Sequence, residues 1–410
     1  MQNTIITYPR ELDIIFHTLI QHNLKPVIVG GFVRDSLLHI TSKDIDVEVY
    51  NLSNYEQLEK ILHPFGKINS VGKSFGVCKL SYKGLDIDFS MPRHDSKVGN
   101  THTDFHIQTY SHLTFQEAAS RRDFTINAIG YDIKTQKLLD PYHGIDDLEH
   151  KILRVVDEKK FGEDPLRVLR AMQFCARFEL QISPSLLFLA KKMVQQHIFL
   201  YLPKERIFTE FEKLFIKAKK TSLGLLFLQQ IGGCEYFCPS IQHWEKKLYA
   251  LDTILEKRME FFFTLLYFDI SQEKMLHFCH KFTNDKKLLQ AITLLHSHIH
   301  IFSSLKQQDI TTKTLYHIAN EVCIKDIVLL NQALKLNETI LQDIEIKAKE
   351  LGIWTQKLPP LLQGRDLIEY GLTPSKAFQK ILKDAYEAQM DGKFHSIEGA
   401  KKWLEEYLLL

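Results

Sequence analysis

Two short segments in which acidic and apolar residues alternate constrain the fold of this chain more than any other feature. They read DIDVEV at 44–49 and LDIDF at 85–89. A period of two is typical of a β-strand that buries one face. Because alternate residues of a strand point to the same side, Ile45 and Val47 are expected in a core, while the carboxylates of each segment project together on the other side.

Shorter signals around these segments predict a mixed α/β domain over the first part of the chain. Apolar residues recur with a helical period before and after a buried apolar run that stops at Gly30-Gly31. The expected elements are helices at 11–23 and 32–39 and strands at 26–29, 77–80 and 85–89, with a hairpin turn at 81–84.

After Pro141 the pattern is helical almost to the last residue. Prolines and paired glycines mark the expected breaks between helices, at Pro184, Pro203, Gly232-Gly233, Pro239 and Pro359-Pro360. The predicted fold class is therefore α+β, with a mixed α/β N-terminal domain followed by an all-helical remainder.

The composition limits where such a chain works. No apolar run approaches the ~20 residues that span a bilayer, and residues 1–10 lack the pattern of a signal peptide. The six cysteines are scattered, which is typical of a reducing compartment. We expect a cytoplasmic protein with no membrane association, and no feature indicates a protein partner. The net charge of +2 means that any affinity for nucleic acid must come from local groups.

Gly30-Gly31, between a strand and a helix, begins the first candidate site. Glycines here let a phosphate approach the backbone, where the free N–H groups of a helix start attract anions. Arg34 follows one turn later and could donate to the same phosphate. The motif alone fits a structural turn better than a binding site.

The alternating acids form the second candidate site. Asp44 and Asp46 share one strand face, and Asp88 on the other segment supplies a third carboxylate. Adjacent carboxylates repel each other unless a cation lies between them, and Mg²⁺ prefers oxygen ligands of this kind. The alternative is an exposed acidic strand edge. Three acids beside a glycine turn fit a two-metal site for phosphoryl transfer. Whether Asp86 assists Asp88 stays open.

The segment RRDFTINA at 121–128 carries groups that suit a nucleotide. Arg121 and Arg122 would suit a triphosphate. Asp123 and Asn127 are four residues apart, so they share a helical face and could reach a ribose hydroxyl. The alternative for Asp123 is a helix cap.

The segment EDPLRVLR at 163–170 combines a helix start with a possible base-reading face. Pro165 makes Asp164 a natural N-cap, and Arg167 and Arg170 follow at spacings of three. Cytosine and adenine each present an amino donor beside a ring-nitrogen acceptor, which a carboxylate and a guanidinium match. Guanine and uracil present the reverse order and would leave buried groups unpaired. An Asp/Arg pair could therefore select C and A.

With these motifs in one order, the chain resembles the class II tRNA nucleotidyltransferase and poly(A) polymerase family. The segments at 138–156, 203–215 and 361–394 also look like this family, whereas 220–350 matches weakly. The principal matching motifs are GGFVRD at 30–35, DID at 44–46, DFSMPR at 88–93, RRDFTINA at 121–128 and EDPLRVLR at 163–170.

The resemblance implies four parts and a set of roles. The parts are a nucleotidyltransferase-type head (1–137), a helical neck with nucleotide-selecting residues (138–215), a helical body (216–350) and a helical tail that contacts tRNA (351–410). The implied roles are metal binding by Asp44 and Asp46, a third catalytic carboxylate in Asp88, triphosphate binding by Arg34, Arg122 and Arg170, and base selection by Asp164 and Arg167.

Two positions depart from the family pattern. Gln173 stands where relatives often have an arginine. Phe268, before Asp269, stands where a metal-binding histidine of a phosphohydrolase module would be expected, so that module is predicted to be degenerate or absent. The histidines and cysteines of the helical region match no standard zinc spacing.

The implied activity is the template-independent addition of C, C and A to the 3′ end of tRNA from CTP and ATP, with release of pyrophosphate and with Mg²⁺ as cofactor. Addition of A alone and poly(A) synthesis are the alternatives. The long polar segment 93–113, with Gly99, His102 and His106, is expected to form a mobile loop that could reshape the pocket between C and A. Relatives that add only the Cs look shorter here, which disfavours an enzyme of that kind. Residues 403–410 lack a basic extension, which disfavours poly(A) synthesis. A non-catalytic RNA-binding protein is disfavoured by the intact set of three acids. A signalling enzyme that acts on small molecules is disfavoured by the long helical region, which small substrates do not need.

Overall fold

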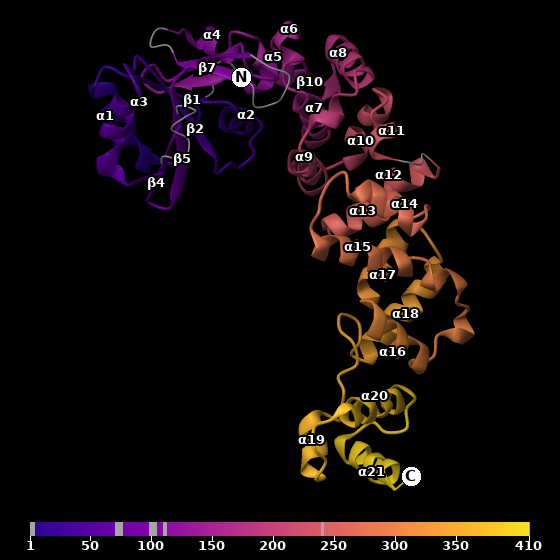
Figure 1. Cartoon of the computed structure of the whole chain (residues 1–410). Coiled ribbons are helices and arrows are strands. Elements are labelled where there is room, and N and C mark those ends of the chain that lie inside the picture. Colours follow the sequence, from indigo (N-terminus) through magenta and orange to yellow (C-terminus); the bar gives the residue numbers. More distant parts are fainter. Residues whose placement is uncertain (1–4, 70–76, 98–104, 110–112, 239–241, 410) are drawn as a thin grey trace. The chain divides into compact units, whose positions relative to one another are not determined.

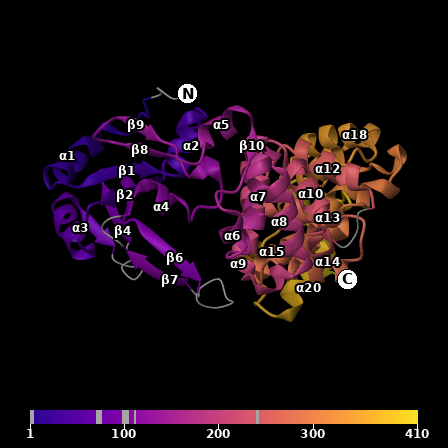
Figure 2. The ribbon, with the colours of Figure 1, turned by 90° about the horizontal axis from the view of Figure 1, so that it is seen from above.

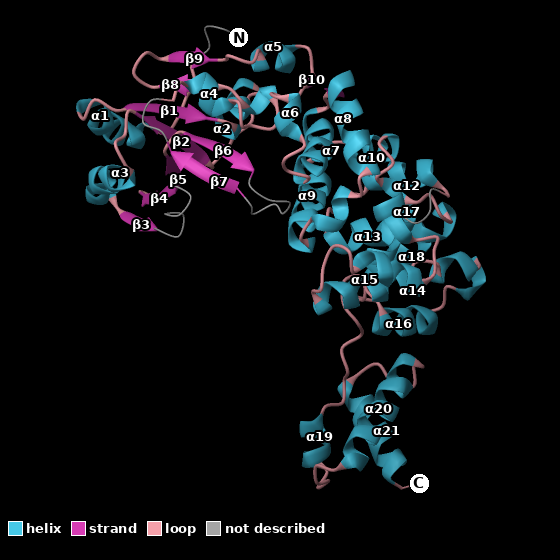
Figure 3. Cartoon of the chain, turned by 45° about the horizontal axis from the view of Figure 1, so that its top comes forward, coloured by secondary structure: helices cyan, strands magenta, loops and turns pink. Residues whose placement is uncertain are grey.

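The computed structural model describes residues 5–69, 77–97, 105–109, 113–238 and 242–409. It divides into two compact units, Met1–Phe237 and Cys238–Leu410 (Figure 1). The larger sheet and all the named strands lie in the first unit, and the second is helical (Figure 3). The predicted α+β fold class is confirmed, while the four-part division into head, neck, body and tail stays a prediction.

A seven-stranded sheet forms the centre of the first unit, in the order β3-β4-β5-β2-β1-β8-β9. Only β2 and β5 run parallel, and the other neighbours are antiparallel. The strands are β1 (Lys25–Val29), β2 (Ile45–Tyr50), β3 (Lys67–Asn69), β4 (Val77–Tyr82), β5 (Leu85–Ser90), β8 (Gly130–Asp132) and β9 (Lys137–Leu139).

The register of the central strands separates a core face from a polar face. Val47 pairs with Phe89 across β2 and β5, and both side chains are fully buried. Asp46 pairs with Asp88 one residue earlier, so these two carboxylates share the opposite face. The alternation of acid and apolar residues therefore has the predicted structural consequence.

Helices of the first unit cover the sheet and continue into a helical layer, in which α7 packs against α9 and α10 (Figure 2). Ser183 caps α8, with Pro184 at its first position, as a serine–proline start favours. The helices are α1 (Asp13–Gln21), α2 (Gly31–Leu37), α3 (Tyr55–Leu62), α4 (Phe115–Ala119), α5 (Gly144–Glu149), α6 (Glu158–Phe161), α7 (Leu166–Phe178), α8 (Pro184–Gln195), α9 (Lys204–Lys217), α10 (Thr221–Gln230) and α11 (Cys234–Phe237), with 3₁₀ turns η1 (Arg10–Leu12), η2 (His63–Phe65), η4 (Thr125–Asn127) and η5 (Ile198–Tyr201).

The second unit is built on α13, which is buried on almost every side. Its last three helices share a separate apolar cluster that includes Leu367, Ile381 and Leu404. None of the helices described in either unit is long and apolar enough to span a membrane. The helices are α12 (Trp244–Thr253), α13 (Met259–Tyr267), α14 (Gln272–Cys279), α15 (Lys286–His298), α16 (Thr312–Glu321), α17 (Ile324–Ala333), α18 (Glu338–Glu350), α19 (Gly364–Glu369), α20 (Lys376–Met390) and α21 (Ile397–Leu408), with 3₁₀ turns η6 (Ile301–Ser304) and η7 (Gln307–Asp309).

Local expectations were wrong in a few places. The hairpin turn contains only Lys83 and Gly84, with φ of 48° and 81°, because β4 and β5 pair as far as Tyr82 and Leu85. The β2 strand begins at Ile45, so Asp44 precedes it. A two-residue parallel pair, β10 (Ile152–Leu153) with β11 (Gln181–Ile182), interrupts the helical region.

The segment 93–113 contains strands where a loop was expected. Here β6 (Arg93–Lys97) and β7 (Phe105–Thr109) form an antiparallel pair, and His106 lies in β7. Gly99 and His102 lie outside the described residues. The proposed reshaping of a pocket by this segment stays a prediction.

Candidate active site

A cavity of about 510 Å³ in the first unit gathers most of the predicted site residues. Its walls come from the glycine turn after β1, from β2, from the segment 121–127 and from the start of α7. All the predicted residues except Asp44 and Asp88 line it, and Leu166 and Arg206 join them: Gly30, Gly31, Arg34, Asp46, Arg121, Arg122, Asp123, Asn127, Asp164, Leu166, Arg167, Arg170 and Arg206.

The glycine turn leaves room for an arginine. Gly30 has a φ of 70°, and a Cβ atom there would lie 2.7 Å from Nη1 of Arg122. A larger residue at this position would therefore be strained and would also displace the guanidinium. The turn supports the cavity wall, whether or not a phosphate binds to its backbone.

Arg34 is held firmly at the back of the cavity and is only 4% exposed. Its guanidinium donates to Asp35 Oδ1 and to Asn127 Oδ1, and it lies over the rings of Phe174 and Phe178. Burial lowers the pKa of Arg34, and Asp35 partly offsets this. The role predicted for Arg34, triphosphate binding, would need an approach from the cavity side.

Two of the three predicted catalytic carboxylates lie side by side. Asp46 and Asp88 are direct partners in the parallel register of β2 and β5. Among the described residues, the buried Oδ1 of Asp88 has no hydrogen-bond partner, although Lys79 Nζ lies 3.5 Å away. Asp44 is exposed just before β2. Besides this ion pair with Lys79, Oδ1 of Asp88 could coordinate an oxygen-preferring cation.

The charges around Asp46 favour a cation. Burial raises the pKa of Asp46, Arg122 opposes this, and Asp88 and Asp44 raise the pKa further. A divalent ion between these groups would offset their repulsion. Within the described part of the chain, no three His, Cys, Asp or Glu side chains converge as a ready metal site. Metal binding by Asp44 and Asp46 therefore stays a prediction.

Glu48 is a site residue that the sequence analysis missed. It follows Asp46 by two residues on β2, so it lies on the same face, and it is buried. Its Oε1 accepts from Nη2 of Arg121 at 3.0 Å and from Nη2 of Arg122 at 2.9 Å. Burial alone would raise the pKa of Glu48, but Arg122 and Arg121 outweigh it and lower the pKa. The alternation that revealed Asp46 also contained Glu48.

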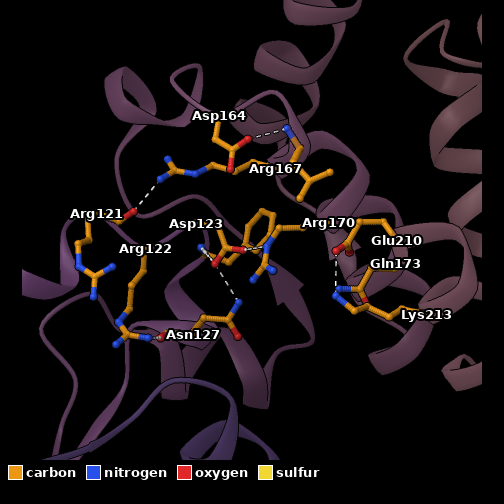
Figure 4. Close-up of polar contacts among 12 residues, drawn as sticks. Arg121, Arg122, Asp123, Asn127, Asp164, Arg167, Arg170, Gln173, Glu210 and Lys213 are labelled. Atoms are coloured by element: carbon orange, nitrogen blue, oxygen red, sulfur yellow. Dashed lines mark hydrogen bonds and ion pairs between the residues drawn. The ribbon is translucent and has the colours of Figure 1, made fainter. Parts of the chain in front are cut away.

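Asp123 joins two segments of the site. Its Oδ1 accepts from the side chain of Asn127 at 2.9 Å, and its Oδ2 accepts from Nε of Arg170 at 2.5 Å (Figure 4). Asp123 and Asn127 thus meet as predicted, but through the 3₁₀ turn η4 rather than an α-helix. Asp123 bonds the N–H of Phe124 and caps no α-helix. Burial would raise the pKa of Asp123, but Arg170 and the Asn127 hydrogen bond lower it below its usual value.

Asp164 has a structural role that leaves part of the hydrogen-bonding capacity of its carboxylate unused. Its Oδ1 accepts from the N–H of Leu166 at 3.0 Å, so the predicted helix-start contact exists. Its Oδ2 lies 3.4 Å from Nη2 of Arg206 on α9. A carboxylate accepts about four hydrogen bonds, so capacity remains on the cavity side. The sequence analysis did not single out Arg206, because its contact spans two helices.

Arg167 is fixed by backbone carbonyls. Nη1 donates to the backbone oxygen of Lys160 at 2.8 Å. Nη2 donates to the backbone oxygen of Arg121 at 2.7 Å (Figure 4). A guanidinium has five N–H groups, so donors remain for a ligand. Its orientation is set before any ligand arrives, as base recognition requires.

The cavity has more cations than anions. Its walls carry Arg34, Arg121, Arg122, Arg167, Arg170 and Arg206 against Asp46, Asp123 and Asp164. Several guanidinium groups around one hollow suit the bidentate recognition of phosphate groups. The cavity can therefore hold a nucleotide, with its phosphate groups at the arginines and its base at the start of α7.

The two departures from the family pattern have distinct surroundings. Gln173 is 1% exposed and accepts from Nη1 of Arg177 at 3.4 Å, one turn further along α7. In the second unit, Asp269 lies 2.7 Å from the ammonium group of Lys247, which is also 1% exposed. A buried lysine thus occupies one side of the carboxylate that a metal-dependent phosphohydrolase would use.

Comparisons with known protein families match two stretches of the chain, one in each unit. Residues 27–154 match the poly(A) polymerase head domain, and residues 255–406 match domain 2 of tRNA nucleotidyltransferases. Such nucleotidyltransferases generally use divalent metal ions.

Curated relatives share about half of their length with this chain. The CCA-adding enzyme of Buchnera aphidicola subsp. Schizaphis graminum is 36% identical over 215 residues, covering 52% of this chain and 49% of that protein. The CCA-adding enzyme of Blochmanniella pennsylvanica is 38% identical over 221 residues, covering 53% and 51%. The chain therefore spans about half the length of the curated relatives that it matches.

Solved structures show the same fold over nearly the whole chain. A CCA-adding enzyme of Bacillus stearothermophilus in complex with CTP has a TM-score of 0.75 at 21% identity, covering 98% of each chain. That of Thermotoga maritima complexed with tRNA has a TM-score of 0.72 at 21% identity, covering 98% of this chain and 97% of the other. Together with the matching motifs, these findings lead to one assignment: the chain belongs to the class II tRNA nucleotidyltransferase and poly(A) polymerase family.

Proposed function

We propose that this protein adds C, C and A to the 3′ end of tRNA from CTP and ATP, without a nucleic-acid template and with release of pyrophosphate. One observation carries the proposal. A single cavity combines Asp46 on β2, an arginine-rich wall and an Asp/Arg pair at the start of α7. The names of the curated relatives support the same activity.

Asp44 and Asp46 would hold two Mg²⁺ ions, with Asp88 as the third catalytic carboxylate. Such ions would lower the pKa of the attacking 3′-hydroxyl and neutralise the triphosphate. The pairing of Asp46 with Asp88 across β2 and β5 supports this, as do the charges of Asp88 and Asp44, which raise the pKa of Asp46. Gly30 and Gly31 would let the phosphates approach the backbone, and the arginines would orient the chain of phosphates for in-line attack. Asp123 and Asn127 would reach the ribose.

Asp164 and Arg167 would act as the base selector. The free acceptor of Asp164 matches the amino group of C or A, and the remaining donors of Arg167 match the ring nitrogen. Both side chains are held by backbone groups, which supports a rigid reading surface. A uracil or guanine would leave buried groups unpaired. The tail over 351–410 would contact the tRNA, and a cytoplasmic location is supported by six free cysteines.

Addition of A alone and poly(A) synthesis are the competing activities. The experiment incubates the full chain with Mg²⁺ and a tRNA that lacks its last three nucleotides, and it reads extension on a single-nucleotide gel. CTP alone should add two residues, and CTP with ATP should add three. Failure to use CTP would identify an A-only enzyme, and long A tails on a non-tRNA oligonucleotide would identify a poly(A) polymerase.

A further inference from the structure

Glu48 is a buried carboxylate behind two arginines of the active-site wall. Among the described residues, it hydrogen-bonds neither the acids of the metal site nor the base-reading pair. We propose that it is a positioning residue that holds Arg121 and Arg122 toward the bound nucleotide. The inference rests on the function proposed above, since it assigns Glu48 a task in nucleotide binding. It extends that function by naming the group on which the orientation of both arginines depends.

The contacts of Glu48 use both of its oxygens. Oε1 accepts from Arg121 at 3.0 Å and from Arg122 at 2.9 Å, and Oε2 accepts from the hydroxyl of Tyr50 at 2.7 Å. The side chain is 1% exposed. A buried carboxylate is costly unless it is paired, and removing one partner leaves the other uncompensated. Glu48 and the two guanidinium groups therefore depend on one another for their position.

Arg122 is clamped from two sides. One nitrogen, Nη2, bonds Glu48 on β2, and the other, Nη1, donates to the backbone oxygen of Asn127 at 3.3 Å. Gly30 provides the space, because a Cβ there would lie 2.7 Å from Nη1. Among the described residues, the buried Nε of Arg122 has no hydrogen-bond partner. The clamp thus fixes a guanidinium that borders the cavity.

Arg121 carries the connection further, to the base-reading helix. Its side chain bonds Glu48, while its backbone oxygen accepts from Nη2 of Arg167 at 2.7 Å. A path of direct contacts therefore runs from β2, which bears Asp46, through Glu48 and Arg121 to Arg167 on α7. Loss of Glu48 is expected to disturb the nucleotide affinity first and the base selection second.

Electrostatics alone predicts the opposite effect, and this makes the proposal testable. Glu48 places a negative charge beside two cations that face a polyanion. If Glu48 were only a counter-ion, its neutralisation would strengthen the attraction of Arg121 and Arg122 for the triphosphate. If it positions them, neutralisation weakens nucleotide binding, because the two guanidinium groups repel and lose their common anchor.

The experiment compares Glu48→Gln with the parent in the full chain, by measuring KM and kcat for ATP on a tRNA that lacks only its last A. We expect KM to rise about tenfold with kcat changed less than about threefold, as for a loss of nucleotide binding. The matched control is Tyr50→Phe, which removes the bond to Oε2 but keeps both arginine contacts. Its KM should stay within about twofold of the parent value.

A cycle of variants separates positioning from a general loss of structure. In an Arg122→Ala background, Glu48→Gln should add little to the rise in KM, because both changes disrupt the same clamp. Arg122→Lys keeps the positive charge but cannot bond both Glu48 and the backbone of Asn127, so it should also raise KM. This variant replaces Glu48→Gln as the test if Glu48→Gln does not fold.

Three outcomes would overturn the proposal: an unchanged or lower KM for a well-folded Glu48→Gln, additive effects in the cycle, or an unchanged KM for Arg122→Lys. A parent enzyme that adds no nucleotide would instead refute the proposed function. A parent that adds nucleotides normally beside an unaffected Glu48→Gln would refute this inference alone.

Discussion

Asp46 lies where parallel strands bring two carboxylates together, and its removal is the sharpest residue-scale test of the metal assignment. Asp46→Asn should reduce turnover about 100-fold or more, because an amide binds a divalent ion poorly and the hydroxyl is then not activated. Melting temperature and tRNA affinity should remain near the parent values. Steady-state rates with saturating ATP and Mg²⁺ provide the measurement.

Asp86 supplies the matched control. It lies on the same face of β5 as Asp88, but its Oδ1 accepts from the hydroxyl of Ser81 at 2.6 Å. Asp86→Asn should keep turnover within about threefold of the parent. More than a tenth of the parent rate in Asp46→Asn, or equal losses in both variants, would show that the metal assignment is wrong.

Arg167 tests base selection. Arg167→Ala should reduce the preference for CTP and ATP over UTP and GTP by roughly 1–3 kcal/mol, the usual worth of a base-edge contact. The rates with each nucleotide alone give this preference. Arg206→Ala is a useful comparison, since it removes the partner of Asp164 without removing a proposed base contact. Unchanged rejection of UTP and GTP by Arg167→Ala would leave Asp164 as a helix cap only.

Part of this site could be predicted from single residues, and part could not. Asp46 and Asp88 follow from an alternation that fixes which side each residue faces. Glu48 has the same alternation, but its burial depends on two arginines more than seventy positions away, which no local pattern indicates. Arg206 likewise depends on how α9 packs against α7. Sequence periodicity gives the direction of a side chain but not its distant partner.

At the scale of elements, the strands with strict alternation and the helices bounded by proline could be predicted. The short strands β3, β8, β9, β10 and β11 could not, because two or three residues carry too little period to distinguish them from a turn. The pair of β6 with β7 was missed because β6 reads RHDSK and has no apolar residue to show an alternating pattern. The pair is defined by its antiparallel backbone register, from Arg93 with Thr109 to Lys97 with Phe105.

Phe268 and Asp269, which directly follow helix α13, test the prediction for the middle region. No phosphatase or cyclic phosphodiesterase activity is expected with any divalent metal, because Phe268 replaces a histidine ligand and Lys247 pairs with Asp269. Release of phosphate from nucleoside monophosphates with a series of divalent ions is the measurement. Metal-stimulated release that is lost in Asp269→Asn would contradict the prediction.

His296 on α15 makes the stability of the second unit depend on pH. Burial lowers the pKa of His296, and its Nε2 contacts the backbone oxygen of Tyr267 at 3.1 Å. Its folded-state pKa is thus below the unfolded value of about 6.5. As pH falls through that value, the unfolded chain binds the proton first, so the free energy of unfolding decreases.

The measurement is the melting temperature between about pH 7.5 and 5. His296→Gln should lose less stability over this range than the parent, whereas the exposed His277→Gln should behave like the parent. Parallel curves for His296→Gln and the parent would show that His296 does not contribute to the pH dependence of stability.

At the scale of the whole molecule, the described structure assigns most candidate chemistry to the first unit. The fold and the order of the motifs were predictable, because each motif is local and the family resemblance runs along the chain. The division after Phe237 was not, since the helical pattern continues on both sides of Gly232-Gly233. A helical period reveals that residues form helices but not which helices pack together.

The central claim is that the protein itself chooses C, C and A and then stops. The most direct measurement offers the purified chain a tRNA without its last three nucleotides, Mg²⁺ and all four nucleoside triphosphates at equal concentration. Mass spectrometry of the 3′-terminal fragment then reads the added sequence. The account predicts a single product extended by C, C and A. Incorporation of U or G, continued addition of A, or no extension at all would contradict it.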